Sequence, residues 1–235
     1  MPDETPDIWI FGYGSLMWNP GFPFAEARHA RLDGYHRAFC IYSIHYRGSP
    51  RRPGLVLGLD RGGSCDGMAF RLEPATAAAT LAYVRRRELI YSVYRESLVP
   101  ISLVGNPSIE QPPVVALAYI AERAHPAYAG RIALARQVQL IRGAIGTAGT
   151  NLDYVANTLA HLAGLGIEER RLSRILTTAS PFVSRGLVAH DRRARSVALA
   201  RSWALKPVER PRSVRDNRFG HRAKLAGALK APEFR

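Results

Sequence analysis

The start of the chain contains a β-branched and aromatic run that leads directly into a glycine-bearing loop. Residues 8–11 are Ile-Trp-Ile-Phe, and Gly12-Tyr13-Gly14-Ser15 follow at once. Residues of the first kind are typical of a buried strand, and glycines let the backbone turn sharply straight after it. The sequence therefore predicts a core strand that ends in a short loop, a position where proteins often bind ligands.

Short apolar stretches alternate with clusters of glycine, proline and serine between Arg37 and Arg71. This alternation of apolar stretches and turn residues is typical of an antiparallel sheet or barrel. Two more strands are predicted further along, the second of them entered from Pro112-Pro113, which stops any helix. The apolar stretches are 38–44, 55–59 and 68–72, the clusters between them are 48–54 and 61–67, and the later strands are 98–104 and 114–120.

Helices are predicted in three places. Residues 75–88 contain strong helix formers, and Ala77, Leu81 and Val84 are spaced along one helical face that Glu88 continues. Two later helices are expected near 132–145 and at about 152–165. Thr150-Asn151 can cap the last of these helices, and Gly166 can end it. Together these elements predict an α+β fold.

The positive charge is concentrated at the end of the chain. The formal net charge is +14 over 235 residues, but residues 1–180 hold 19 Arg against 15 acidic residues, so that residues 181–235 carry a net +10. We expect one domain over 1–180 and a basic, partly disordered extension over 181–235. Such a segment can bind nucleic acid or an anionic membrane surface. A solvated extension is favoured, because interleaved aromatic residues and a known reader motif are lacking.

The first residues and the two cysteines indicate in which cellular compartment the protein is expected. Residues 1–7 are acidic, and the apolar run 8–11 is far too short for a signal peptide or a membrane span, so a cytoplasmic protein without membrane association is expected. Cys40 and Cys65 have neither Cys-x-x-Cys spacing nor a disulfide framework around them, and two apolar thiols are expected.

The sequence of the glycine loop does not match two well-known motifs. A dinucleotide fingerprint needs a third glycine where this chain has Met17, and Asn19-Pro20 breaks the helix that should follow. A serine-hydrolase elbow needs glycines on both sides of Ser15, at positions that Tyr13 and Met17 occupy. What remains is either an ordinary tight turn or a loop whose backbone N–H groups converge on an anion.

Metal and phosphate sites are not indicated. Seven histidines are scattered, with no pair at i,i+4 beside a carboxylate, so neither a metal nor another cofactor is predicted. Arg85-Arg86-Arg87 could bind phosphate, but a helix spreads three consecutive residues around its circumference, and a solvated face is favoured.

Glu88 is the most informative single residue. A carboxylate on the apolar face of a helix must be desolvated or paired, and desolvation raises its pKa toward the range of a general base near neutral pH. The alternative is a structural ion pair with Arg85 or Arg95. Spacing alone does not separate the two interpretations.

Several separated motifs together resemble the ChaC family of γ-glutamylcyclotransferases, over about residues 9–176. The chain departs from many family members just after the glutamate, where residues 90–94 lack a glycine. The matching segments are residues 9–18 with the Tyr-Gly-Ser-Leu loop, 45–50 with 53–56, the predicted hairpin 62–69, the Arg-Glu pair 87–88 with Leu89, 125–130 and 149–154.

The resemblance implies a mixed fold with a small closed or nearly closed β-sheet and flanking helices. It implies an enzyme that cyclises the γ-glutamyl group of glutathione to 5-oxoproline and releases cysteinylglycine, with Glu88 as the catalytic acid and base and no cofactor. Tyr13 and Tyr94 are further candidates as wall residues or hydroxyl donors, and simple packing beside a core strand is the alternative for both. The implied substrate-binding residues are Ile10, Phe11, Gly12, Tyr13, Gly14, Ser15 and Leu16.

Two other functions stay open at this point. The enzyme could act on other γ-glutamyl amino acids or amines through the same glutamate and loop. Alternatively, the chain could be a basic nucleic-acid or membrane-surface binder, although neither partner is expected from the extension. A small molecule is the expected partner, and a monomer or weak dimer the expected state.

Removal of residues 181–235 should leave turnover of glutathione largely intact, because every residue matched to the chemistry lies earlier in the chain. Release of 5-oxoproline by the truncated and full-length proteins measures this. A truncated protein that is folded but inactive would show that the extension helps to build the site.

Overall fold

The structure is a computed structural model that describes residues 7–89, 91–105 and 112–180. The basic extension lies outside these residues. The described residues fall into two compact units, one made of 7–43 with 55–137 and the other of 44–54 with 138–180.

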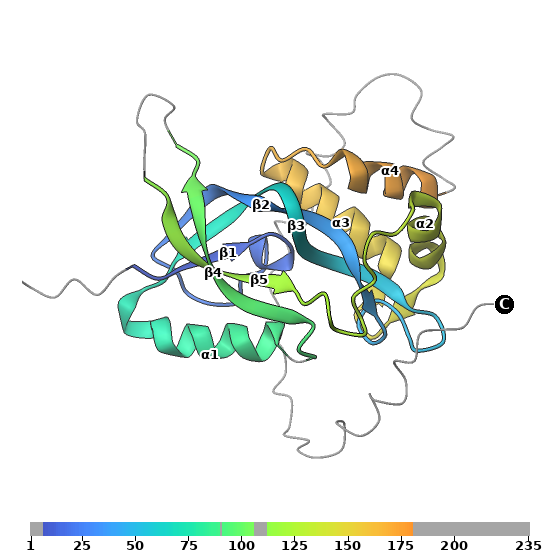
Figure 1. Ribbon diagram of the computed structural model, residues 1–235, viewed down its shortest axis with the longest axis horizontal. Coiled ribbons are helices and arrows are strands. Elements are labelled where there is room, and N and C mark those ends of the chain that lie inside the picture. The colour runs from blue at the N-terminus through green and yellow to red at the C-terminus, as the bar shows by residue number, and fades with distance from the viewer. Residues whose placement is uncertain (1–6, 90, 106–111, 181–235) are drawn as a thin grey trace, which may run out of the picture. The chain divides into compact units, whose positions relative to one another are not determined.

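The first unit contains a closed β-barrel, which confirms the predicted closed sheet (Figure 1). Its strands follow the order β1-β3-β2-β4-β5, and β5 pairs back onto β1 and β3. The strands are β1 (Trp9–Gly12), β2 (Glu26–Ser43), β3 (Gly54–Arg71), β4 (Tyr94–Leu103) and β5 (Val114–Ala121).

Strand β1 is the buried strand that the sequence predicts, with all four residues in the core. It runs antiparallel to β3, with Gly12 opposite Met68, and parallel to β5, with Ile10 opposite Leu117. β4 runs antiparallel to β5 and begins at Tyr94, opposite the last residue of β5. The end of β1, the end of β5 and the start of β4 therefore meet at one end of the barrel.

The predicted hairpin at 62–69 is wrong, because β3 continues through it. Gly62 and Gly63 have positive φ angles of 95° and 70°, which bend the strand without reversing it. β2 also begins well before the apolar stretch at 38–44. Its first half is polar and partly exposed, and Arg31 Nη2 donates to Ser64 Oγ on β3 at 2.6 Å.

Helix α1 (Ala77–Glu88) follows a short 3-10 turn, η2 (Pro74–Thr76), and matches the predicted helix closely. Its buried residues are Ala77, Thr80 and Val84, whereas Leu81 is only half-buried, so the buried face is rotated slightly from the predicted one. The backbone N–H of Leu89 donates to the carbonyl of Arg85 at 2.9 Å and closes the last turn at Glu88.

Helices dominate the remaining described residues. Thr150 caps α3 as predicted, since its Oγ1 accepts from the N–H of Asp153 at 3.0 Å. α4, which the sequence reasoning missed, lies beside α3 and buries Leu172, Ile175 and Ala179 (Figure 1). None of the helices in the described part of the chain has the length and apolar character that a membrane span requires. The elements are α2 (Leu134–Gly143), β6 (Ile145–Gly146), β7 (Gly149–Thr150), α3 (Asn151–Gly164) and α4 (Arg170–Ala179).

Gly67 occupies a position on β3 with no room for a side chain. A Cβ there would collide with the carbonyl oxygen of Gly12 and lie 2.8 Å from the ring of Phe11. We expect Gly67→Ala to lower the free energy of unfolding by roughly 1–3 kcal/mol, measured by denaturant titration. Gly164→Ala is the control, because nothing lies within 4 Å of its added Cβ. Equal stability of the Gly67→Ala variant and the parent protein would contradict the packing of β1 against β3.

Candidate active site

The glycine loop turns tightly at the end of β1. It forms a short 3-10 helix, η1 (Ser15–Met17), in which the N–H of Met17 donates to Gly14 and that of Asn19 to Ser15, both at 2.9 Å. A Cβ on Gly12 would lie 3.2 Å from Leu16 Cβ, so glycine permits this close approach. The loop is therefore held in one shape by its own backbone.

A buried arginine supports the loop from β2. Arg37 is only 4% exposed, and its Nε donates to the carbonyl of Tyr13 at 2.6 Å. Its Nη2 donates to the carbonyl of Asp66 on β3, also at 2.6 Å. Hydrogen bonds of this kind make a buried guanidinium tolerable. The sequence reasoning missed Arg37, which precedes an apolar stretch and has no local signal of burial.

Most of the predicted substrate-binding residues belong to the core. Within residues 10–16, Ser15 is the exception, because this residue is only half-buried. The buried members of the set are Ile10, Phe11, Gly12, Tyr13, Gly14 and Leu16.

Glu88 is the last residue of α1, and 17% of its side chain is exposed. Arg87 Nε lies 3.2 Å from Glu88 Oε1. Burial raises the pKa of Glu88 above its usual value of 4.5, and the positive charge of Arg87 only partly opposes this rise. Glu88 therefore holds a proton more readily than an ordinary surface carboxyl.

The two ion pairs suggested for Glu88 are not formed. Arg85 Nη2 instead pairs with Glu96 at 2.8 Å, and Arg95 Nε lies 3.9 Å from Glu122. One turn of helix separates Arg85 from Glu88, but the Arg85 side chain is directed to β4. The partner of Glu88 is the adjacent residue, Arg87.

The prediction that Arg85, Arg86 and Arg87 form a solvated face is wrong for Arg87. Arg86 is exposed, but the Arg87 side chain is only 22% exposed and reaches the glycine loop. Its Nη2 donates to Ser15 Oγ at 2.9 Å, and its Nη1 donates to the carbonyls of Asn19 at 2.7 Å and Pro20 at 3.1 Å. The structure thus brings together two predicted site residues, Glu88 and Ser15, through a third that was not predicted.

A buried tyrosine near Glu88 contacts a second carboxylate, Glu96. Tyr119 on β5 is 1% exposed, and its hydroxyl donates to Glu96 Oε2 at 3.2 Å. Burial raises the pKa of Tyr119, and the negative charges of Glu96 and Glu88 raise it further.

Arg85 donates to both carboxylate oxygens of Glu96 and keeps the pKa of that carboxyl low. Glu96 therefore stays ionised while the pKa of Glu88 is raised.

Tyr94 begins β4 at the same end of the barrel. Its hydroxyl donates to the carbonyl of Leu57 at 2.7 Å. The predicted hydroxyl donor is thus engaged with the backbone of β3, and its ring is half-buried. The position fits the alternative that the sequence allowed, a residue of the wall.

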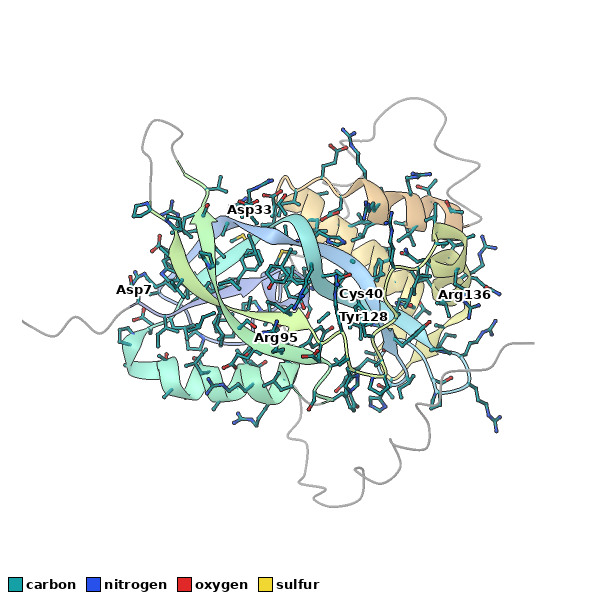
Figure 2. The ribbon with its side chains drawn as sticks, viewed as in Figure 1. Asp7, Asp33, Cys40, Arg95, Tyr128 and Arg136 are labelled. Carbon is teal, nitrogen blue, oxygen red and sulfur yellow. The ribbon has the colours of Figure 1, made fainter. Side chains whose placement is uncertain are left out.

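Another polar cluster in this unit is structural. Asp60 accepts from Arg123 Nε at 2.8 Å and from the Tyr128 hydroxyl at 2.9 Å. Figure 2 shows Tyr128 next to Cys40, whose carbonyl accepts from the N–H of Ala129 at 2.7 Å. Burial raises the pKa of Cys40 to about 12, which disfavours the reactive thiolate form. Within the described ranges no group of His, Cys, Asp and Glu side chains is arranged to hold a metal ion.

Comparison with known proteins identifies the class. The sequence model of the ChaC-like protein family matches residues 8–180. The chain therefore belongs to the ChaC-like family.

Two relatives are similar over most of their length. The Escherichia coli K12 protein named glutathione-specific gamma-glutamylcyclotransferase is 34% identical over 78% of this chain and 77% of its own. The human glutathione-specific gamma-glutamylcyclotransferase 1 is 32% identical over 72% of this chain and 77% of its own. A crystal structure of the yeast γ-glutamyl cyclotransferase specific to glutathione shares the fold, with a TM-score of 0.66 and 21% identity over 76% of this chain and 100% of that chain.

The raised pKa of Glu88 predicts how the Glu88→Gln variant responds to pH. A carboxyl whose pKa is higher in the folded state takes up a proton on folding, so its ionisation costs stability as pH rises from about 4.5 through the folded value. The neutral variant avoids this cost. We expect a melting temperature at pH 8 equal to or above that of the parent protein, and no advantage at pH 4.

Melting curves across this pH range test the expectation. A structural ion pair predicts the opposite result, a large loss of stability at pH 8, because the variant would leave Arg87 without its carboxylate. Arg86→Met, at an exposed position of the same helix, controls for a general effect of altering α1.

Proposed function

We propose that this protein is a glutathione-specific γ-glutamylcyclotransferase in which Glu88 moves the proton. The observation that carries the proposal is a mostly buried carboxyl with a raised pKa, tied through Arg87 to a rigid glycine loop. Family membership and the names of the relatives support the same activity. Residues 1–180 form the catalytic part, and residues 181–235 are an accessory extension.

The reaction is intramolecular. The free α-amine of the γ-glutamyl group attacks its own γ-carbonyl, a new C–N bond closes a five-membered ring, and the amide bond to cysteine breaks. The products are 5-oxoproline and cysteinylglycine, so no water or external group is consumed. The protein must fold the γ-glutamyl chain into a reactive shape and move one proton from the attacking nitrogen to the leaving nitrogen.

Glu88 suits this transfer because it must act first as a base and then as an acid. A pKa above the usual carboxyl value brings it nearer to the working pH, which favours both steps. Backbone N–H groups of residues 12–16 hold the γ-glutamyl carboxylate and the oxyanion that develops at the γ-carbonyl. Tyr94 forms part of the wall.

Glutathione is the substrate favoured over other γ-glutamyl compounds. The bacterial and human relatives both carry glutathione-specific names. The match to this chain covers more than two thirds of the length of each relative. All these substrates share the γ-glutamyl group and therefore the same glutamate and loop. They differ only in the leaving group, so a panel of γ-glutamyl amino acids ranks them directly.

The test is release of 5-oxoproline from glutathione by the purified protein and by its Glu88→Gln variant. Glutamine keeps the size of the side chain but cannot accept the proton, and we expect kcat to fall by about a hundred- to ten-thousandfold with little change in substrate binding. A folded variant with the parent kcat would exclude Glu88 as the proton carrier.

N-acetylated glutathione provides the matched substrate control. Its blocked α-amine cannot attack the γ-carbonyl, so turnover should be lost while glutathione is still consumed. Release of N-acetylglutamate from this compound would indicate hydrolysis by water and a different reaction.

A further inference from the structure

Arg87 contacts three separate parts of the barrel unit through its three guanidinium nitrogens. Nε pairs with Glu88 at the end of α1, and Nη2 donates to Ser15 in the glycine loop. Nη1 donates to the carbonyls of Asn19 and Pro20 in the turn that follows. The side chain is 22% exposed, so these contacts are partly shielded from water. One planar group therefore sets the distance between the loop and the carboxyl.

The contact with Arg87 determines that the Ser15 hydroxyl accepts a hydrogen bond on that side. A guanidinium can only donate hydrogen bonds, so Ser15 Oγ must be the acceptor in the 2.9 Å contact. The hydrogen of the hydroxyl is then directed away from Arg87. It is available to donate to an anionic acceptor such as the carboxylate of a γ-glutamyl group.

The contact with Glu88 affects its protonation. The charged and titratable groups around Glu88 are Arg87 on the same helix, Tyr119 on β5, and Glu96, which Tyr119 contacts and Arg85 neutralises. Among them, Arg87 supplies the positive charge that opposes the effect of burial on the pKa of Glu88. Without it, Glu88 would remain protonated to a higher pH and could not accept a proton from the amine.

We propose that Arg87 is a positioning residue that holds the glycine loop and the Glu88 carboxyl in one geometry and makes Ser15 a hydrogen-bond donor to the substrate carboxylate. This inference rests on the proposed function. It requires the shape of arginine as well as its charge, since the ammonium of lysine is a compact point charge that cannot direct three nitrogens along three fixed directions.

The experiment compares Arg87→Lys, Arg87→Met and Arg86→Met in 5-oxoproline release from glutathione. We expect Arg87→Lys to lose about 10- to 100-fold in kcat/KM, the size of effect that a small misplacement of reacting groups produces. Arg87→Met should lose at least as much and should shift the acid limb of the kcat profile to higher pH. Arg86→Met should behave like the parent protein, because that side chain is exposed on the same turn of α1.

A double-mutant cycle with Ser15→Ala tests the hydroxyl. If Arg87 acts through Ser15, the rise in KM caused by Ser15→Ala should be much smaller in the Arg87→Met background than in the parent. Equal effects in the two backgrounds would refute this part of the proposal. If Arg87→Met does not fold, the same cycle is run with Arg87→Lys.

The outcomes separate the two levels of inference. If the parent protein releases no 5-oxoproline from glutathione, the proposed function fails. If the parent is active and Arg87→Lys keeps its full kcat/KM, only the positioning role fails. An unchanged acid limb in Arg87→Met would likewise show that the ion pair does not control Glu88.

Discussion

The parallel pairing of β1 with β5 determines which segments of the barrel unit can meet. Parallel strands end on the same side, so the loop after β1 lies at the end of β5. β4 is antiparallel to β5 and begins at that end, opposite Ala121. α1 ends at Glu88, only a few residues before β4 begins, and its last turn is therefore held at the same end. The strand pairing thus brings a carboxyl from one part of the sequence to a loop from another.

Two arginines then fix the loop and the turn that follows it through their carbonyl groups. Arg37 donates to Tyr13, and Arg87 donates to Asn19 and Pro20. In a trans peptide unit the C=O and N–H groups point in opposite directions. The carbonyl of Tyr13 is directed at Arg37, so the N–H of Gly14 is directed away from this guanidinium. A loop whose carbonyls are bound by protein cations is well suited to present N–H groups to an anion.

The sequence predicted the elements whose pattern is local. A few neighbouring residues are enough to recognise the apolar run of β1, the helix formers of α1 and the Thr150 cap of α3. The spacing of the strands predicted an antiparallel sheet or barrel, and the closed or nearly closed sheet was what the family resemblance implied. β3 was divided wrongly at Gly62-Gly63, because glycines with positive φ look the same in sequence whether they bend a strand or reverse it. The polar first half of β2 showed no apolar alternation and was missed for that reason.

The candidate site was only partly predictable for the same reason. Glu88 was recognisable from its place on an apolar helix face together with the family resemblance. The roles of Arg37 and Arg87 depend on contacts with residues far away in the sequence, and no local pattern distinguishes Arg87 from its exposed neighbour Arg86. The sequence offered Arg85 or Arg95 as an ion-pair partner of Glu88. Arg85 instead donates to both carboxylate oxygens of Glu96 on β4, a contact that helical spacing does not reveal.

The opposing effects on Glu88 are what a single-carboxyl mechanism requires. Burial alone would favour the protonated form and leave no base to receive the proton of the attacking amine. A strong, fully formed ion pair would favour the carboxylate and leave a poor acid for the leaving nitrogen. Contact with Arg87 through one nitrogen, while its other nitrogens bind the loop, gives a partial compensation that leaves the pKa raised. In the proposed mechanism, the arginine that contacts the loop would thereby also keep the carboxyl able to act as both base and acid.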